Sequence, residues 1–533
     1  MFNGLISGFS GLLSPSALAL LLVGTLIGTL VGAIPGLGGA VLLTLLLPFI
    51  YGMPIVPALA LLLAAHTGIY FSGSVTAILF NTPGAPESAA TTFDGYAMTR
   101  AGQPARALGI SAAATTIGGW IGVALLFVLI PFMSKLATLF HASEYLALAV
   151  LAIVLIGQMR AASATKGLLS GAIGLMTSFV GYDPITGVQR YTGGYQSLYN
   201  GFNITAAALG LFALSEMFRI YATGHDSLSA SGGAASIREG DHPDNKVLTG
   251  VRDVLHYPWL TIRSAVLGTV LGIIPGIGGI AANFISYGQA MKISKHPERF
   301  GQGTPEGIIA PESSSISKEA GNLLPTVALG VPGGVGMAVL LSGFTILGIV
   351  PGPAMLKDHV DAVWAMALVI GVGSLLSSLT GLGLAPLLAR LAKVPGRMLV
   401  PFVVALGFLG VYAASDELAQ VTVMVAFGVA GYLMTRFGYS LPAAMIGFIL
   451  GKVVENNLYL VSQLQGWGAL RRPITDVMVA ITVMSLFGPL LKRGVRLIAP
   501  RRQAVALTAP VPADTEEPLD DRATPTTTAG EQR

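Results

Sequence analysis

Long apolar runs dominate the sequence and return about every 25 to 35 positions, separated by short polar segments. Each run is long enough to cross a hydrocarbon core of about 30 Å as a helix. The first charged side chain is Glu87, so the first two runs are uncharged. The pattern predicts an all-α polytopic membrane protein with about ten to twelve transmembrane helices, some of them broken or re-entrant.

One interrupted run occurs twice. Residues 28–39 read GTLVGAIPGLGG and residues 268–279 read GTVLGIIPGIGG, with eight of twelve positions identical and Pro35 and Pro275 240 positions apart. Proline removes a backbone donor and glycine accepts backbone angles that other residues avoid, so each helix is expected to stop and restart here. The alternative is a Gly-rich surface for close helix packing. The duplication with its proline retained favours broken helices.

A second pair of breaks follows. TPGA at 82–85 ends one apolar run, and VPGG at 331–334 ends another, with Pro83 and Pro332 249 positions apart. We therefore expect two inverted repeats with broken or re-entrant Gly-Pro helices. The expected divisions are a first transmembrane repeat at 1–220, a polar linker at 221–257, a second transmembrane repeat at 258–499, and a disordered tail at 500–533 that is rich in Pro, Thr and acidic residues.

The four breaks predict a binding site. Inside a membrane, freed backbone groups must face other protein or a wet cavity, and the amides of a restarting helix suit a carboxylate. Paired Gly/Pro interruptions in two halves indicate the site of a secondary transporter. The carbonyls freed by the same breaks are expected to hold a driving Na⁺. The candidate residues are Pro35, Gly36, Gly38, Gly39, Asn81, Thr82, Pro83, Gly84, Pro275, Gly276, Gly278, Gly279, Asn283, Ser286, Glu312, Ser313, Ser315, Pro332, Gly333 and Gly334.

Several of these residues have alternative interpretations. Gly279, Asn283 and Ser286 share one helical face by their i, i+4, i+7 spacing. Glu312 is expected either to take a proton or cation at membrane depth, or to lie in a wetted loop. Asn81 and its neighbours offer uncharged ligands or form a polar turn. Asp183 and Arg190, in a Gly- and Pro-punctuated loop, are interpreted as a local ion pair rather than as substrate contacts.

Composition narrows the class further. Apolar residues make up 53% of the chain and charged residues 11%, far below the soluble average of about 25% charged. The absence of cysteine excludes disulfides, thiolate metal sites and cysteine catalysis. The formal charge of +4 comes from short loops and the C-terminus, which argues against a nucleic-acid surface. We find no His-Glu-x-x-His or Gly-x-Ser-x-Gly motif, so we expect no enzyme and no cofactor beyond a coupling Na⁺ or H⁺.

Loop charges test the inversion. The loop at 51–57 after the first break carries no Lys or Arg, whereas 291–300 carries three. After the second break the bias reverses, with Arg100 and Arg106 in the first half against Lys357 beside two acidic residues in the second. Under the positive-inside rule, equivalent loops then lie on opposite sides of the membrane. The basic cluster at 492–502 predicts a cytoplasmic C-terminus.

The motifs together resemble the large membrane (permease) subunit of the tripartite tricarboxylate transporter family. The matching stretches span roughly residues 24–352 and include GAIPGLGG, LPFIYGMP, ILFNTPGAPESAATTFDGYAM, QPARALGI, GYDPITGVQRYT, IIPGIGG, APESS and LPTVALGVPGG. One stretch departs from the family. After Pro-Glu relatives usually show Asn-Asn-Ala, whereas this chain has Ser315, Ile316 and Ser317, followed by Lys318 and Glu319. That departure leaves the substrate open.

The resemblance implies uptake of a small organic di- or tricarboxylate across the bacterial inner membrane, driven by a sodium or proton gradient. It also implies two partners besides the lipid bilayer, a small membrane subunit and a periplasmic substrate-binding protein. An elevator movement follows only by analogy of fold. The alternative function is a partner-independent channel or exporter, for which flux would need neither a gradient nor a binding protein.

Overall fold

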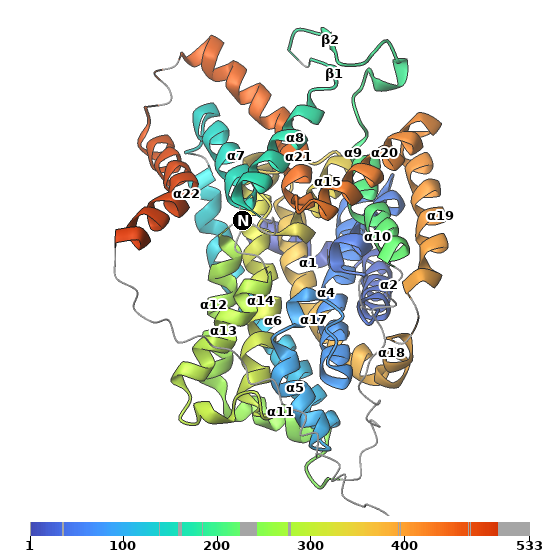
Figure 1. Ribbon diagram of the computed structural model, residues 1–533, viewed down its shortest axis with the longest axis vertical. Coiled ribbons are helices and arrows are strands. Elements are labelled where there is room, and N and C mark those ends of the chain that lie inside the picture. The colour runs from blue at the N-terminus through green and yellow to red at the C-terminus, as the bar shows by residue number, and fades with distance from the viewer. Residues whose placement is uncertain are drawn as a thin grey trace, which may run out of the picture. The chain divides into compact units, whose positions relative to one another are not determined.

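The computed structural model describes residues 2–34, 37–137, 139–157, 163–183, 185–223, 242–274, 279–392, 394, 396–466, 468 and 471–498. Contacts divide the chain into two units, Met1–Leu486 and Phe487–Arg533, and the first unit carries the features below. Pro35, Gly36, Pro275, Gly276 and Gly278, together with the predicted tail, lie outside the described residues. The fold is all-α, as predicted, apart from one short hairpin (Figure 1).

The first half begins with a short helix and then alternates long helices with breaks. Its elements are α1 (Phe2–Leu12), α2 (Pro15–Gly32), α3 (Gly39–Leu46), η1 (Leu47–Ile50), α4 (Ile55–Phe80), η2 (Pro86–Ser88), α5 (Thr91–Arg100), α6 (Pro104–Ala137), α7 (Ala142–Gly157), α8 (Ala164–Ser178), the antiparallel strands β1 (Gly181–Tyr182) and β2 (Gln189–Arg190), η3 (Gln196–Leu198), α9 (Ile204–Ala208), the π-helix η4 (Leu209–Leu214) and α10 (Ser215–Thr223).

The second half opens in the same order. Its elements are α11 (Val247–His256), α12 (Pro258–Ile273), α13 (Gly279–Ile293), η5 (Pro297–Arg299), α14 (Glu306–Leu329), α15 (Val335–Ile346), α16 (Pro353–Asp358), α17 (Val360–Gly383), α18 (Ala385–Leu391), α19 (Gly396–Ser415), α20 (Leu418–Arg436), α21 (Leu441–Tyr459), the π-helix η6 (Leu460–Gln465) and α22 (Pro473–Ile498). Helix α11 occupies part of the stretch expected to be a polar linker.

Seven described helices are long and apolar enough to cross a membrane, and six further apolar helices are shorter. The long ones are Pro15–Gly32, Ile55–Phe80, Pro104–Met133, Ile204–Ala222, Val360–Gly383, Leu418–Arg436 and Leu441–Gln463. The chain is therefore a polytopic membrane protein. Three of its short apolar helices lie next to predicted breaks, because Pro258–Ile273 precedes one and Gly39–Ile50 and Val335–Ile346 each follow one.

Glycines set the spacing of α2 against α4. A Cβ placed on Gly28 would lie 2.1 Å from the carbonyl oxygen of Ala65, so only glycine permits this approach. The second half repeats the contact, because a Cβ on Gly268 would lie 2.4 Å from the carbonyl oxygen of Ser314. Close backbone packing through small residues is a common way for membrane helices to associate. The Gly-rich motif thus agrees with both sequence interpretations, close helix packing and a broken helix, because its first glycine packs against a neighbouring helix and the helix ends a few residues later.

The central helix of each half also packs against a helix of the other half. Helix α6 of the first half packs along α14, and α17 of the second half packs along α4. The short leading helices follow the same exchange, with α1 on α17 and α11 on α6. As a result α4 and α14 are enclosed on nearly all sides, and almost every residue of both helices is buried. Two central helices with polar residues in their middles are the natural place to look for a site.

Candidate functional site

Helices α4 and α14 run in opposite directions where their side chains meet. Tyr70 of α4 contacts Glu319 of α14, while Ser74, one turn later on α4, contacts Glu312, two turns earlier on α14. We call these contacts, together with those of His66 and Lys318, the α4–α14 junction. Tyr70 and Glu319 are themselves 249 positions apart, the same shift that relates Pro83 to Pro332. Equivalent positions of the two halves therefore touch each other.

Helices α4 and α14 end in the same way. Asn81 caps α4 and Gly330 caps α14, both with left-handed backbone at φ 56° and φ 70°, and these positions are again 249 residues apart. Glycine and asparagine are the residues that tolerate this conformation at a helix C-terminus. Asn81 is exposed, so the structure gives it a capping role in the turn. The Thr82 hydroxyl donates to the carbonyl of Phe80 in the same turn.

In each half, the segment of the second break packs back against the central helix near the junction. The Gly84 amide donates to the Gly73 carbonyl, and a Cβ on Gly84 would lie 2.3 Å from the carbonyl oxygen of Gly32, the last residue before the first break. In the second half a Cβ on Gly333 would lie 2.7 Å from Asn322 of α14. Pro332 and Gly333 are buried and Gly334 is half-buried. In each half, the second break thus packs against the middle of the central helix.

Breaks from opposite halves meet around His66. A Cβ on Gly39, the first residue of α3 after Gly38, would lie 3.1 Å from the His66 ring, and one on Gly336 of α15 would lie 2.4 Å from it. For the other two breaks, Phe93 of α5 packs edge-to-face against Phe284 of α13, which begins at Gly279. Thr91 of α5 and Ser286 of α13 bond α14 directly, so the described flanks of the four breaks pack against α4 or α14.

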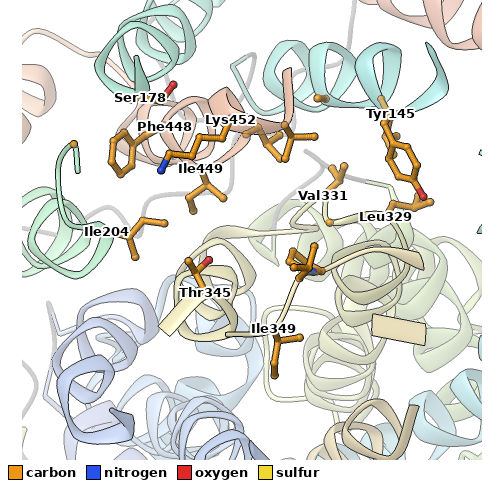
Figure 2. A pocket seen from close by; sticks show the side chains of 18 of the residues that line it. Tyr145, Ser178, Ile204, Leu329, Val331, Thr345, Ile349, Phe448, Ile449 and Lys452 are labelled. Atoms are coloured by element: carbon orange, nitrogen blue, oxygen red, sulfur yellow. The ribbon is translucent and has the colours of Figure 1, made fainter. Parts of the chain in front are cut away.

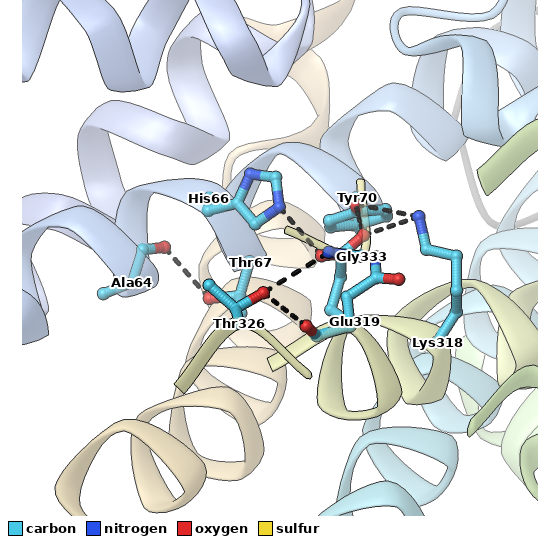
Figure 3. A network of polar contacts seen from close by, with 9 residues as sticks. Ala64, His66, Thr67, Tyr70, Lys318, Glu319, Thr326 and Gly333 are labelled. Carbon is cyan, nitrogen blue, oxygen red and sulfur yellow. Dashed lines mark hydrogen bonds and ion pairs between the residues drawn. The ribbon is translucent and has the colours of Figure 1, made fainter. Parts of the chain in front are cut away.

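The junction contains a buried charged cluster (Figure 3). The Glu319 carboxylate lies 2.5 Å from the Lys318 ammonium and 3.2 Å from His66 Nε2, and it also accepts hydrogen bonds from Tyr70 and Asn322. The Lys318 ammonium sits 5.4 Å over the Tyr70 ring. Both charged side chains are at most 5% exposed. The Glu319 carboxylate is thus compensated by the Lys318 ammonium and by neighbouring hydrogen-bond donors.

A second carboxylate lies on the same helix but has different neighbours. Glu312 is 3% exposed and accepts four hydroxyl hydrogen bonds, from Ser74, Thr91, Ser111 and Thr115. Its place within α14 excludes the wetted loop that was one sequence interpretation. No described basic side chain pairs with Glu312. The two carboxylates of the junction therefore differ in charge compensation.

The candidate residues next to Glu312 are also buried. Asn283 is 1% exposed, and neither atom of its amide has a hydrogen-bond partner. One turn later, the Ser286 hydroxyl donates to the carbonyl of Ala310, so this part of α13 faces α14. The Ser313 hydroxyl is buried without a partner as well, and Ser315 is buried on α14. Unsatisfied buried polar groups are uncommon in proteins, so Asn283 and Ser313 stand out from the other buried side chains of these helices.

Outside the junction, the carboxylate of Asp94 fixes the loop that contains Gly301, Gly303 and Thr304. Asp94 of α5 accepts hydrogen bonds from the amides of Gly301, Gly303 and Thr304 and from the hydroxyl of Tyr287. Burial raises the pKa of Asp94 above its ordinary value, while these donors oppose the shift. The expected pair of Asp183 and Arg190 also forms, at 3.7 Å, with Glu455 of α21 as the closer partner of the arginine at 2.5 Å. Both features read as structural.

The cavity drawn in Figure 2, of about 400 Å³, lies beyond the end of α14 rather than at the junction. Its lining is mainly apolar, with Tyr145, Asn200, Thr345 and the charged Lys452 among the polar residues. Gly330 and Val331, directly before the VPGG break proline, also line it. None of the predicted site residues does so. Among the described residues, no group of three or more His, Asp and Glu side chains is arranged to hold a metal ion.

Several residues of the junction are not among the predicted site residues, namely His66, Tyr70, Ser74, Lys318, Glu319 and Asn322. The sequence does contain a signal for some of them. His66, Tyr70 and Ser74 recur at i, i+4 and i+8 along a mainly apolar helix, which places three polar groups on one face. Polar groups in a helix that is buried on all sides need partners, so such a stripe indicates a facing polar stripe.

Comparison with known proteins decides the family. Residues 18–446 match the model of the tripartite tricarboxylate transporter TctA family. The chain belongs to this family. A protein of the TctA family is a subunit of a transporter that works with other subunits and a substrate. The resemblance seen in the motifs is therefore confirmed.

Two relatives from Agrobacterium vitis extend the comparison of this TctA-family chain. One, described as an uncharacterized 52.8 kDa protein in the TAR-I ttuC' 3' region, is 32% identical over 86% of this chain and 89% of its own length. The other, described as an uncharacterized protein in the TAR-II ttuC' 3' region, is 31% identical over 36% of this chain and 79% of its own length. No solved structure matches.

Proposed function

We propose that this subunit imports small organic di- or tricarboxylates across the bacterial inner membrane in a secondary transporter. A periplasmic binding protein delivers the substrate, a small membrane subunit assists, and a sodium or proton gradient drives uptake. Membership of the TctA family supports the transporter class. The observation that carries the location of the site is that the flanks of all four breaks adjoin the α4–α14 junction.

The proposed substrate site lies where these breaks converge. Backbone amides at the starts of α3, α13 and α15 and around η2 would bind the carboxylates, because positive helix ends favour anions. The paired halves would act as inverted repeats. This is supported by the opposite directions of α4 and α14 at Tyr70 and Glu319 and by the exchange of partner helices between halves. The candidate residues of the four breaks remain the proposed ligands.

The proposed orientation places the C-terminus in the cytoplasm. Three arginines lie close together in the fold: Arg100 ends α5, Arg106 lies in the first turn of α6, and Arg299 ends η5. Asp94 of α5 bonds the loop after η5, and α5 contacts α6. A positive charge excess on one side marks that side as cytoplasmic. The cavity at the end of α14 would then open towards the periplasm, because α14 begins beside α5 and its residues run away from it.

A reconstituted system tests the proposal. Uptake of radiolabelled citrate and related carboxylates is measured in liposomes that contain this subunit and the small membrane subunit, with and without the cognate binding protein and with imposed sodium or proton gradients. We expect accumulation only when a gradient and the binding protein are both present. Flux that needs neither would instead establish the alternative, a partner-independent channel or exporter.

A matched pair of variants tests the site within the same assay. Gly84→Ala places a methyl group 2.3 Å from the carbonyl oxygen of Gly32, whereas Gly288→Ala adds one where no atom lies within 4 Å. We expect Gly84→Ala to abolish uptake and Gly288→Ala to retain it, with both proteins present in the membrane. Equal uptake by the two variants would contradict the placement of the site at the breaks.

A further inference from the structure

Glu312 is a buried ionisable side chain of the junction that lies within α14 and belongs to none of the helix breaks. Its two carboxylate oxygens accept hydroxyl hydrogen bonds from three separate elements, at 2.7 Å from Ser74 of α4, 2.9 Å from Ser111 of α6, 2.9 Å from Thr115 of α6, and from Thr91 of α5. The Ser88 hydroxyl of η2 lies 3.1 Å from that of Ser74. Four hydroxyls thus donate to one carboxyl group, and a fifth contacts one of the four.

Within the part of the chain that the structure describes, no cation pairs with this carboxyl group. The charged and titratable groups on the surrounding elements either pair with other residues or are acidic or neutral. They are His66 and Tyr70 on α4, Glu87 in η2, Asp94 on α5, Arg106 at the start of α6, Tyr287 on α13, and Glu306, Lys318 and Glu319 on α14. Lys318 and His66 pair with Glu319, and Arg106 pairs with Asp253. An isolated carboxylate in a dry interior costs several kcal/mol, so Glu312 has reason to become neutral.

The size of the site selects the neutralising ion. A metal ion such as Ca²⁺ requires oxygen ligands about 2.3–2.6 Å away on every side, and Na⁺ is of similar size. The hydroxyl oxygens here already lie in direct hydrogen-bond contact with the carboxylate oxygens, which leaves no room for a metal ion between them. A proton fits without displacement. We call the hydroxyls of Ser74, Thr91, Ser111 and Thr115 the hydroxyl ring. Because a hydroxyl both donates and accepts, one of them can turn to accept a hydrogen bond from the protonated carboxyl group.

We infer that Glu312 is the site of proton coupling, carrying one proton per cycle as a neutral carboxylic acid within the hydroxyl ring. This inference rests on the proposed function and names its driving ion. The proton binds one carboxylate oxygen from the outer aqueous side and leaves to the inner side, which regenerates the carboxylate. Thr91, at the start of α5, bonds Glu312 directly, and Ser88 of η2 reaches it through Ser74, so the charge of Glu312 changes contacts in the segment that follows the break at 82–85, beside the proposed substrate site.

The buried amide of Asn283 supports a changing environment. Both of its polar atoms lack partners, and it lies one turn before Ser286, whose hydroxyl bonds Ala310 two residues ahead of Glu312. A buried amide without partners is costly in a permanently closed interior. Its position between the first break of the second half and the Glu312 region fits a polar surface that meets substrate or water during part of the cycle.

Infrared spectroscopy of the full chain in lipid nanodiscs tests the proton directly. We expect a protonated-carboxyl band at neutral pH that shifts in heavy water, appears in the wild-type minus Glu312→Gln difference spectrum, and is absent from the wild-type minus Glu306→Gln difference spectrum. The absence of this band from the wild-type minus Glu312→Gln difference spectrum would overturn the inference. This readout does not depend on transport, so a failure of the proposed function leaves it interpretable.

Transport of radiolabelled citrate in the reconstituted system gives the second readout. Glu312→Gln mimics the neutral acid, so we expect it to retain citrate counterflow but to lose accumulation driven by a pH gradient, while Glu312→Asp keeps driven uptake at a lower rate. Accumulation by Glu312→Gln at the wild-type level, or wild-type uptake that follows a sodium gradient and ignores the pH gradient, would overturn proton coupling. Absence of citrate counterflow in the wild type would count against the proposed function alone.

Discussion

The charged cluster of the junction allows a quantitative test by a double-mutant cycle. Lys318→Met removes the cation that lies 2.5 Å from the Glu319 carboxylate, and both side chains are at most 5% exposed. Breaking a buried ion pair by removing one partner typically costs about 3–5 kcal/mol, because the remaining charge stays buried. His66 Nε2, at 3.2 Å, and the donors Tyr70 and Asn322 still contact the carboxylate in this variant and limit the loss. We therefore expect Lys318→Met to lose about 3 kcal/mol, the lower end of that range.

Replacing both partners should cost less than replacing one. In Lys318→Met/Glu319→Gln neither charge remains, so the double variant is expected to be more stable than Lys318→Met alone. Unfolding free energies are measured by denaturant titration in detergent, followed by the fluorescence of the four tryptophans. Lys292→Met, at an exposed position, is the control and should change the unfolding free energy by less than about 0.5 kcal/mol. A double variant as unstable as the sum of the single ones would refute this reasoning.

Three further predictions concern other parts of the fold. Gly84→Ala should also lower the thermal unfolding midpoint, since overpacking typically costs about 1–3 kcal/mol, while Gly288→Ala should not; light-scattering melts in detergent measure this. Asn283→Leu should leave folding unharmed or improve it, because no partner is lost, yet it should reduce uptake; normal uptake would remove Asn283 from the site. Arg106→Met breaks the 2.7 Å ion pair with Asp253 that ties α11 to α6, and hydrogen–deuterium exchange should show faster exchange in α11 alone.

Much of the fold follows from local sequence chemistry. Proline and glycine act on the backbone of their own helix, so the ends of α2 and α12 and the restarts at Gly39 and Gly279 could be predicted. The likeness of TPGA to VPGG indicated the second pair of breaks, and the same 249-residue shift relates the caps Asn81 and Gly330. Asn81 takes the second of its two expected roles, a polar turn, because left-handed backbone favours asparagine for a conformational reason.

The contents of the junction required the structure. Lys318 and Glu319 are adjacent in sequence, and neighbours along a helix do not ordinarily face each other, so their pairing under Tyr70 could not be read from spacing. The assignment of Glu312 to a hydroxyl ring depends on α4, α5 and α6 meeting α14, which is long-range packing. The cavity near Lys452 is likewise assembled from distant segments, so its mainly apolar lining could not be predicted from local sequence patterns.

The central claim is that substrate binds where the four breaks converge on α4 and α14. Because the chain has no cysteine, a single one introduced by Gly334→Cys reports on this place without background. The rate of thiol labelling is measured in the reconstituted complex with and without the carboxylate carried by its binding protein. We expect substrate to slow labelling at this position and to leave Gly288→Cys unaffected. Equal labelling rates at position 334 with saturating, actively transported substrate would contradict the account.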